Sequence, residues 1–182
     1  MAPSEQPAAS ALQALLQDGS LAGAWTLDPA RSEVVLHTRH TWGLRPLRGV
    51  FRQVSGNGTV TKAGDVSGVI TVAAESVDTK NPQRDKHLRS ADFFDVARYP
   101  DITFSVEGVS PAADGVTVAG SLTVRETSRP VSFGAAVSGG DSEVTFDAEV
   151  PVNRTDYGLT FNQLGMMGTR NTITIHAVFT KQ

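Results

Sequence analysis

The sequence predicts a single all-β domain folded as an antiparallel β-barrel of about eight strands. Runs of residues that alternate in polarity or are dense in β-branched side chains recur along the chain, and clusters of turn-forming residues separate them. The length of 182 residues suits one hydrophobic core. Only one interval between the runs, residues 75–100, is long.

The predicted strands span residues 33–40, 50–60, 66–73, 102–109, 116–124, 131–137, 144–150 and 172–180. The turn-forming clusters lie at 55–58 (SGNG), 63–65 (AGD), 113–115 (ADG) and 138–141 (SGGD). Runs joined by short turns must be antiparallel neighbours, because parallel pairing requires a long crossover. Closing the strands into a barrel removes exposed edges, and a sandwich of two sheets is the structural alternative.

The last predicted strand indicates what lines the interior. Ile173, Ile175, Ala177 and Phe179 face one way, so that one side of this strand is fully apolar. The inward-facing candidates on the other strands are mostly small or slender, which leaves room for a long cavity. A barrel filled by its own side chains is the alternative.

Residues 1–23 are predicted to be an extension with a short helix, followed by the barrel domain over 24–182. Leucines at helical spacing predict the helix over 10–17, with Ser10 as its N-cap and Gly19 as its stop. We interpret this helix as a flap over one end of the barrel, and a contact with a partner or a second copy is the alternative.

The long interval is predicted to form a helical insertion. Pro82 is suited to the first turn of a helix, and Leu88, Phe93 and Phe94 are expected to anchor the insertion to the barrel.

Composition excludes several classes of function. The net charge of −3 provides no positive field for nucleic acid, and the absence of cysteine removes disulfides, thiolate metal sites and thiol nucleophiles. No run is apolar for long enough to span a membrane. The N-terminal residues lack the parts of a secretory signal, so we expect a cytoplasmic protein, and an exported chain whose leader has been removed remains the alternative.

Three groups of residues are candidates for binding a ligand. His40 continues the face of Val34 and Leu36, and we expect its imidazole inside the barrel or at its mouth if that face points inward. Arg84, Asp85 and His87, with Arg89, lie in the insertion. They form either a local structural pairing or a cationic rim for a polar head group.

The third group lies near the C-terminus, where Arg154 leads out of a predicted strand into an apolar loop over residues 159–170. Phe161, Met166 and Met167 in that segment suit a lid, because methionine repacks easily around an irregular ligand, and ordinary capping of the barrel end is the alternative. No nucleophile-elbow serine and no compact metal-ligand spacing occurs in the sequence, so no catalytic residue, metal or other cofactor is predicted.

The chain resembles the YceI-like family of polyisoprenoid-binding, lipocalin-like proteins. The segments that carry the resemblance are 25–29 (WTLDP) with Ser32 and His40, 49–51 (GVF), 75–79 (ESVDT), 84–95 (RDKHLRSADFFD), 99–104 (YPDITF), 120–125 (GSLTVR) with 129–131 (RPV), and 153–158 (NRTDYG). The resemblance implies an eight-stranded barrel whose apolar tunnel holds an isoprenoid or a similar chain, often in a homodimer.

These observations together predict a protein that binds, sequesters or transports a long apolar lipid such as a polyisoprenoid, an isoprenoid quinone or a fatty derivative. The expected ligand contacts are His40, Arg84, Asp85, His87, Phe94, Phe104, Arg154, Phe161, Met166, Met167, Ile173, Ile175 and Phe179. The alternatives are an enzyme that modifies such a lipid, a haem-type redox barrel, and a structural or stress-response module without a specific ligand.

Overall fold

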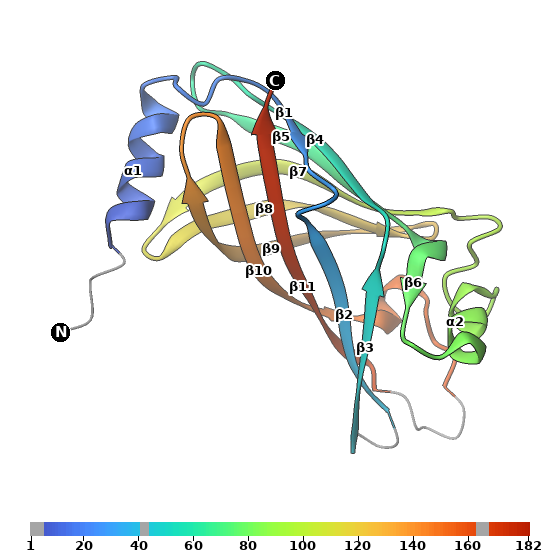
Figure 1. Cartoon of the computed structure of the whole chain (residues 1–182). Coiled ribbons are helices and arrows are strands. Elements are labelled where there is room, and N and C mark those ends of the chain that lie inside the picture. Colours follow the sequence, from blue (N-terminus) through green and yellow to red (C-terminus); the bar gives the residue numbers. More distant parts are fainter. Residues whose placement is uncertain (1–5, 41–43, 163–167) are drawn as a thin grey trace.

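The computed structural model describes residues 6–40, 44–162 and 168–182, and its main feature is a closed antiparallel barrel (Figure 1). The strands of the closed ring, in spatial order, are β1 (Gly23–Leu27), β4 (Val54–Val60), β5 (Val66–Ala73), β7 (Asp101–Ala112), β8 (Gly115–Val124), β9 (Thr127–Gly139), β10 (Glu143–Asn153) and β11 (Arg170–Lys181). The ring closes where β11 pairs with β1, from Trp25 opposite Lys181 to Leu27 opposite Phe179. The predicted eight-stranded barrel is therefore confirmed, and the two-sheet alternative is wrong.

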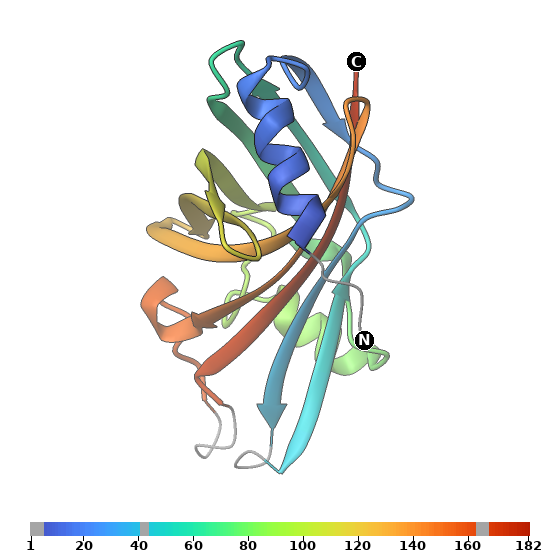
Figure 2. The same ribbon diagram turned by 90° about the vertical axis from the view of Figure 1, so that its left-hand side faces the viewer.

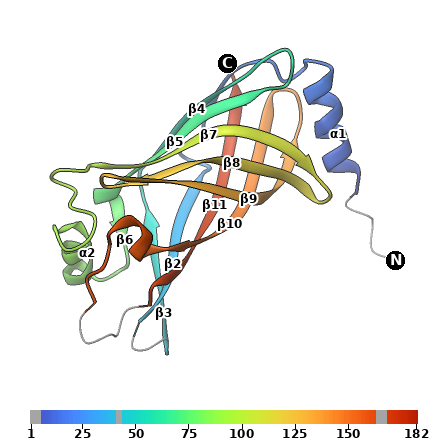
Figure 3. The same cartoon turned by 180° about the vertical axis from the view of Figure 1, so that it is seen from behind.

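The ring is closed at only one end of the barrel. The first part of β11 pairs with β2 (Glu33–His40), which continues through β3 (Arg45–Phe51) to the short β6 (Val77–Asp78). On the other side of β11, the pairing between β9 and β10 ends at Ala135 opposite Ala148, and the two strands diverge beyond it (Figure 3). The barrel therefore flares at this end.

The predicted strand over residues 50–60 is wrong as a single element, because β3 ends at Phe51 and β4 begins at Val54. The backbone N–H of Arg52 donates to the carbonyl of Ser76, and that of Gln53 donates to the hydroxyl of Ser76. These amides are bonded to the insertion, and the chain passes here from the flared part of the sheet to the closed ring.

The predicted turn at 55–58 is also wrong, because these residues lie inside β4. Gly58 pairs with Trp25 on one side and with Gly68 on the other, and a Cβ on Gly58 would lie 3.2 Å from the carbonyl oxygen of Ser67. The glycines here permit close approach of neighbouring strands and do not form a turn.

The N-terminal helix α1 (Gln6–Gln17) covers the closed end of the barrel (Figure 2). It starts before Ser10, so the predicted N-cap is wrong; Pro7 is compatible with the first turn, which allows the earlier start. Gly19 has a φ of +79°, as suits the predicted stop. Leu16 is buried with Leu21 and Trp25 of the barrel end, which is the flap arrangement that the leucine spacing predicts.

Gly115 provides a test of how tightly the strands are packed. Its φ is +146°, and a Cβ there would lie 2.2 Å from the carbonyl oxygen of Ala135. We expect Gly115→Ala to lower the free energy of unfolding by about 3 kcal/mol in urea denaturation. Gly134→Ala is the matched control, because nothing lies within 4 Å of its added methyl group. A similar loss in both variants would contradict this account.

Candidate ligand-binding cavity

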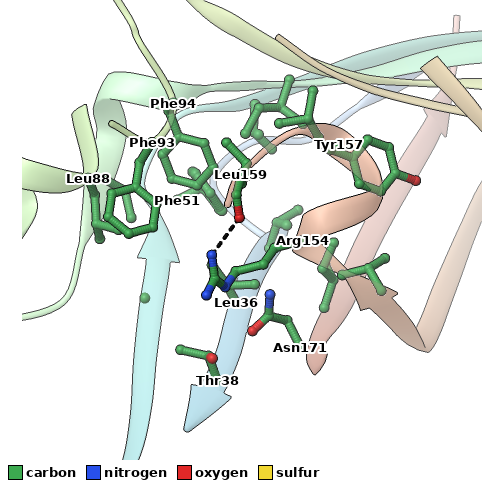
Figure 4. A pocket seen from close by; sticks show the side chains of 18 of the residues that line it. Leu36, Thr38, Phe51, Leu88, Phe93, Phe94, Arg154, Tyr157, Leu159 and Asn171 are labelled. Atoms are coloured by element: carbon green, nitrogen blue, oxygen red, sulfur yellow. Dashed lines mark hydrogen bonds between the residues drawn. The ribbon is translucent and has the colours of Figure 1, made fainter. Parts of the chain in front are cut away.

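The flared end of the barrel encloses a cavity of about 580 Å³. Its walls come from both sides of the flare and from the insertion, and they are mostly aliphatic and aromatic (Figure 4). Representative wall residues are Leu36, Phe51, Val72, Phe94, Leu122 and Ile173. Val131 of β9 and Val152 of β10 also line it, so the cavity extends to both of the strands that diverge.

A second, smaller cavity of about 120 Å³ lies toward the closed end, where Leu12, Leu16 and Trp25 contribute to its lining. The residues that line both cavities are Ile70, Phe104, Phe133 and Ile175, which we call the partition. The rings of Phe104 and Phe133 lie 5.4 Å apart between centroids. Phe179 lines only the smaller cavity.

Gly120 makes space for the partition. It lies between Val118, which lines the smaller cavity, and Leu122, which lines the larger one. A Cβ at Gly120 would lie 2.9 Å from Cζ of Phe104. It would also lie 2.1 Å from the carbonyl oxygen of Ser105, so a larger residue at this inward-facing position would clash with the backbone of β7 as well as with the aromatic ring.

The insertion forms one wall of the larger cavity through α2 (Pro82–Arg89), which follows the short helix η1 (Ala74–Ser76). The Asn81 side chain caps α2 by accepting a hydrogen bond from the Arg84 amide, and Pro82 occupies the first turn as predicted. The expected anchors Leu88, Phe93 and Phe94 are all buried.

Arg84 and Asp85 are joined through Thr79. The buried Asp85 carboxylate accepts hydrogen bonds from the Thr79 amide at 3.0 Å and the Thr79 hydroxyl at 2.5 Å. Arg84 donates to the same hydroxyl at 2.8 Å and to the Thr79 carbonyl at 2.9 Å. Arg84 lines the cavity and Asp85 does not. This is the local structural pairing that the sequence left open.

His87 connects α2 to the segment after β10. Its ring packs edge-to-face against Phe93 and Phe161, at 5.2 and 4.8 Å between centroids, and its Nε2 lies 3.1 Å from the Asp92 carboxylate. Arg89 donates to the carbonyls of Glu75 and Val77 and does not line the cavity. The structure therefore brings Arg84 and His87 to the cavity and directs Arg89 elsewhere.

Arg154 shapes the opposite wall from η2 (Arg154–Tyr157). Its guanidinium is buried and donates to the carbonyls of Leu159, Phe161 and Gly168, at 2.5, 3.0 and 2.9 Å (Figure 4 shows the first). Burial lowers the pKa of this guanidinium, and burial likewise raises the pKa of the Tyr157 hydroxyl. Arg154 thus holds the backbone on both sides of the segment 163–167, which lies outside the described residues together with Met166 and Met167.

The other predicted contacts lie where their strands place them. Ile173 lines the larger cavity, while Ile175 and Phe104 belong to the partition. The backbone of His40 pairs with Arg45 at the end of β2, and the His40 side chain is outside the described part of the structure.

Sequence reasoning missed Asn171. Its side chain is 8% exposed and lines the larger cavity, and its Oδ1 has no hydrogen-bond partner among the described residues. The signal was available in the sequence, because Asn171 lies two residues before Ile173 on the inward face of β11.

Within the described residues, no group of three or more histidine, cysteine or acidic side chains is arranged to hold a metal ion. None of the described helices has the length and apolar character needed to cross a membrane.

The Asp85 cluster is expected to hold the insertion in place. Asp85→Ala leaves the buried Thr79 amide without its acceptor, so we expect a loss of about 2–3 kcal/mol in unfolding free energy and faster hydrogen exchange in α2. Asp92→Ala removes an exposed carboxylate and should change stability by less than about 0.5 kcal/mol. Equal effects in the two variants would show that the cluster has no special anchoring role.

Comparison with known proteins places this architecture in a family. A sequence profile described as the YceI-like domain matches residues 25–179. Protein YceI from Salmonella newport (strain SL254) is 31% identical over 134 residues, which cover 69% of this chain and 68% of the relative.

Solved structures show the same fold. BcnA from Burkholderia cenocepacia superimposes with a TM-score of 0.75 at 23% identity, covering 84% of this chain and 98% of that protein. A polyisoprenoid binding domain from Saccharophagus degradans gives a TM-score of 0.69 at 16% identity, covering 87% and 98%. Since the family profile extends over most of the chain and the barrel is shared with these structures, the chain belongs to the YceI-like family.

Proposed function

We propose that this protein binds a long apolar lipid, such as a polyisoprenoid, an isoprenoid quinone or a fatty derivative, and sequesters or transports it. The observation that carries the proposal is the apolar cavity of about 580 Å³ inside the barrel. A cavity of this size is within the range of sites for small molecules and cofactors. The similarity to a domain described as polyisoprenoid binding supports the same class of ligand.

The energetics favour a chain-like ligand. Transfer of a methylene group from water to an apolar wall contributes ~0.8 kcal/mol, so one five-carbon isoprene unit contributes up to ~4 kcal/mol before ordering costs. A few units therefore supply enough free energy for tight binding. Polar contacts are then needed mainly to select the head group and its orientation.

The two arginines that line the cavity support a role in ligand binding over a role in catalysis. Arg84 donates to Thr79, and Arg154 donates to three backbone carbonyls. These bonds hold the walls together around an apolar interior. The homodimer implied by the family resemblance stays a prediction.

We expect lipid to be recovered from purified protein by organic-solvent extraction and identified by mass spectrometry. Delipidated protein should also bind an isoprenoid analogue, because the apolar walls favour its burial over exposure to water. Protein that is reproducibly empty and binds no such analogue would refute the proposed function.

The partition is expected to limit the length of the bound chain. Phe104→Ala removes a ring shared by both cavities and should join them, so that the preferred isoprenoid alcohol becomes longer by one or two units in a chain-length series of dissociation constants. Phe146→Ala is the matched control, because Phe146 lines only the smaller cavity and its loss leaves the partition intact. The same shift in both variants would contradict a role for the partition.

A further inference from the structure

Asn171 lines the apolar cavity and has a buried polar atom without a hydrogen-bond partner among the described residues. Asn171 and Arg125 are the residues with a buried side-chain nitrogen or oxygen that lacks a hydrogen-bond partner in the described part of the chain, and only Asn171 lines the cavity. An unpaired buried polar atom costs free energy, so such atoms in native proteins are commonly matched by water or by a ligand. The unpaired atom here is Oδ1, which is an acceptor.

The fold determines where this carboxamide lies. Asn171 is opposite Val152 in the β10–β11 ladder, and the next residue, Thr172, is opposite His37 in β2. Side chains alternate along β11, so Asn171 lies on the same face as Ile173 and lines the cavity, near Leu36 and Arg154 (Figure 4). Leu36 has no group that could donate a hydrogen bond to it, and Arg154 donates to the backbone carbonyls of its own wall.

Three polar residues on the insertion side of the cavity are bonded within the protein. Arg84 donates to Thr79, Asn81 accepts from the Arg84 amide, and His87 lies beside the Asp92 carboxylate. The buried acceptor of Asn171, in contrast, is unpaired and lies on the β11 side of the cavity, away from the residues considered for a cationic rim.

We propose that Asn171 recognises the hydroxyl group of a long-chain alcohol. This inference rests on the proposed function and specifies the chemical class of its ligand. The Oδ1 acceptor requires a donor, which a hydroxyl supplies, whereas a quinone carbonyl or an ionised diphosphate supplies only acceptors. A hydroxyl also accepts hydrogen bonds, so it satisfies the carboxamide in either orientation of the amide.

The site also sets the direction of the ligand. Its hydroxyl end lies between β2, β10 and β11, and its chain follows the inward face of β11 past Ile173 toward Ile175 at the partition. The apolar end therefore points toward the closed end of the barrel.

The test compares geranylgeraniol with its methyl ether, which has the same chain and no hydroxyl donor. Both are titrated into the delipidated full-length protein by displacement of a fluorescent apolar probe. We expect the alcohol to bind about tenfold more tightly than the ether, because the ether leaves Oδ1 unpaired. In Asn171→Leu this ratio should fall to about one, with ether binding retained.

Two further measurements separate recognition from a structural role. Asn171→Leu should be at least as stable to urea as the parent protein, because it removes an unsatisfied polar group, and Asn171→Ser should keep a preference for the alcohol. Equal affinities for alcohol and ether in the parent protein, as expected if water alone occupies the site, would overturn the inference and leave the proposed function intact. Tighter binding of geranylgeranyl diphosphate than of the alcohol would also overturn it. Failure to bind any of the three probes would count against the proposed function itself.

Discussion

The structure depends on the way β11 divides its backbone hydrogen bonds between two partners. One end of this long strand pairs with β1 and closes the ring, and the other end pairs with β2 and continues into a separate extension of the sheet. The backbone edge of a strand must be paired with another strand or covered. The closed end and the flared end therefore satisfy their strand edges in different ways. At the closed end side chains pack beneath α1 and leave only the smaller cavity, whereas the flared end is covered by α2 and η2.

The cavity is a consequence of this flare. Where β9 and β10 separate, their inward side chains no longer meet across a narrow barrel, and an interior space of about 580 Å³ remains. Toward the closed end the same strands approach, and the aromatic pair of Phe104 and Phe133 separates this space from a much smaller one. Gly120 is needed at that level because a Cβ there would clash with the carbonyl oxygen of Ser105 at 2.1 Å and with the Phe104 ring at 2.9 Å.

Polar side chains around the cavity have two different roles. Asp85 and Arg84 join the insertion to Thr79, and Arg154 fixes the backbone on the opposite wall. These groups organise the walls through bonds within the protein. Asn171 differs because its acceptor oxygen has no partner in the described residues, and this is the basis of the head-group preference that we propose for the apolar interior.

The sequence by itself determined the elements and the family. Alternating residues predicted the strands, and Pro82 predicted the start of α2, because these features depend on local backbone geometry and side-chain spacing. The inward face of β11 was likewise readable, since side chains alternate along any strand. The break between β3 and β4 was not, because it arises from hydrogen bonds to Ser76 in the distant insertion.

Only the tertiary structure decided how the candidate site is assembled. Arg84 and Arg89 look alike in the sequence, yet one reaches the cavity wall and the other binds the carbonyls of Glu75 and Val77. The division of the interior into two cavities and the unpaired oxygen of Asn171 depend on which side chains from distant strands meet. The spacing of residues along a strand sets the face on which a side chain lies. The side chains that it contacts depend on how the barrel closes at one end and flares at the other.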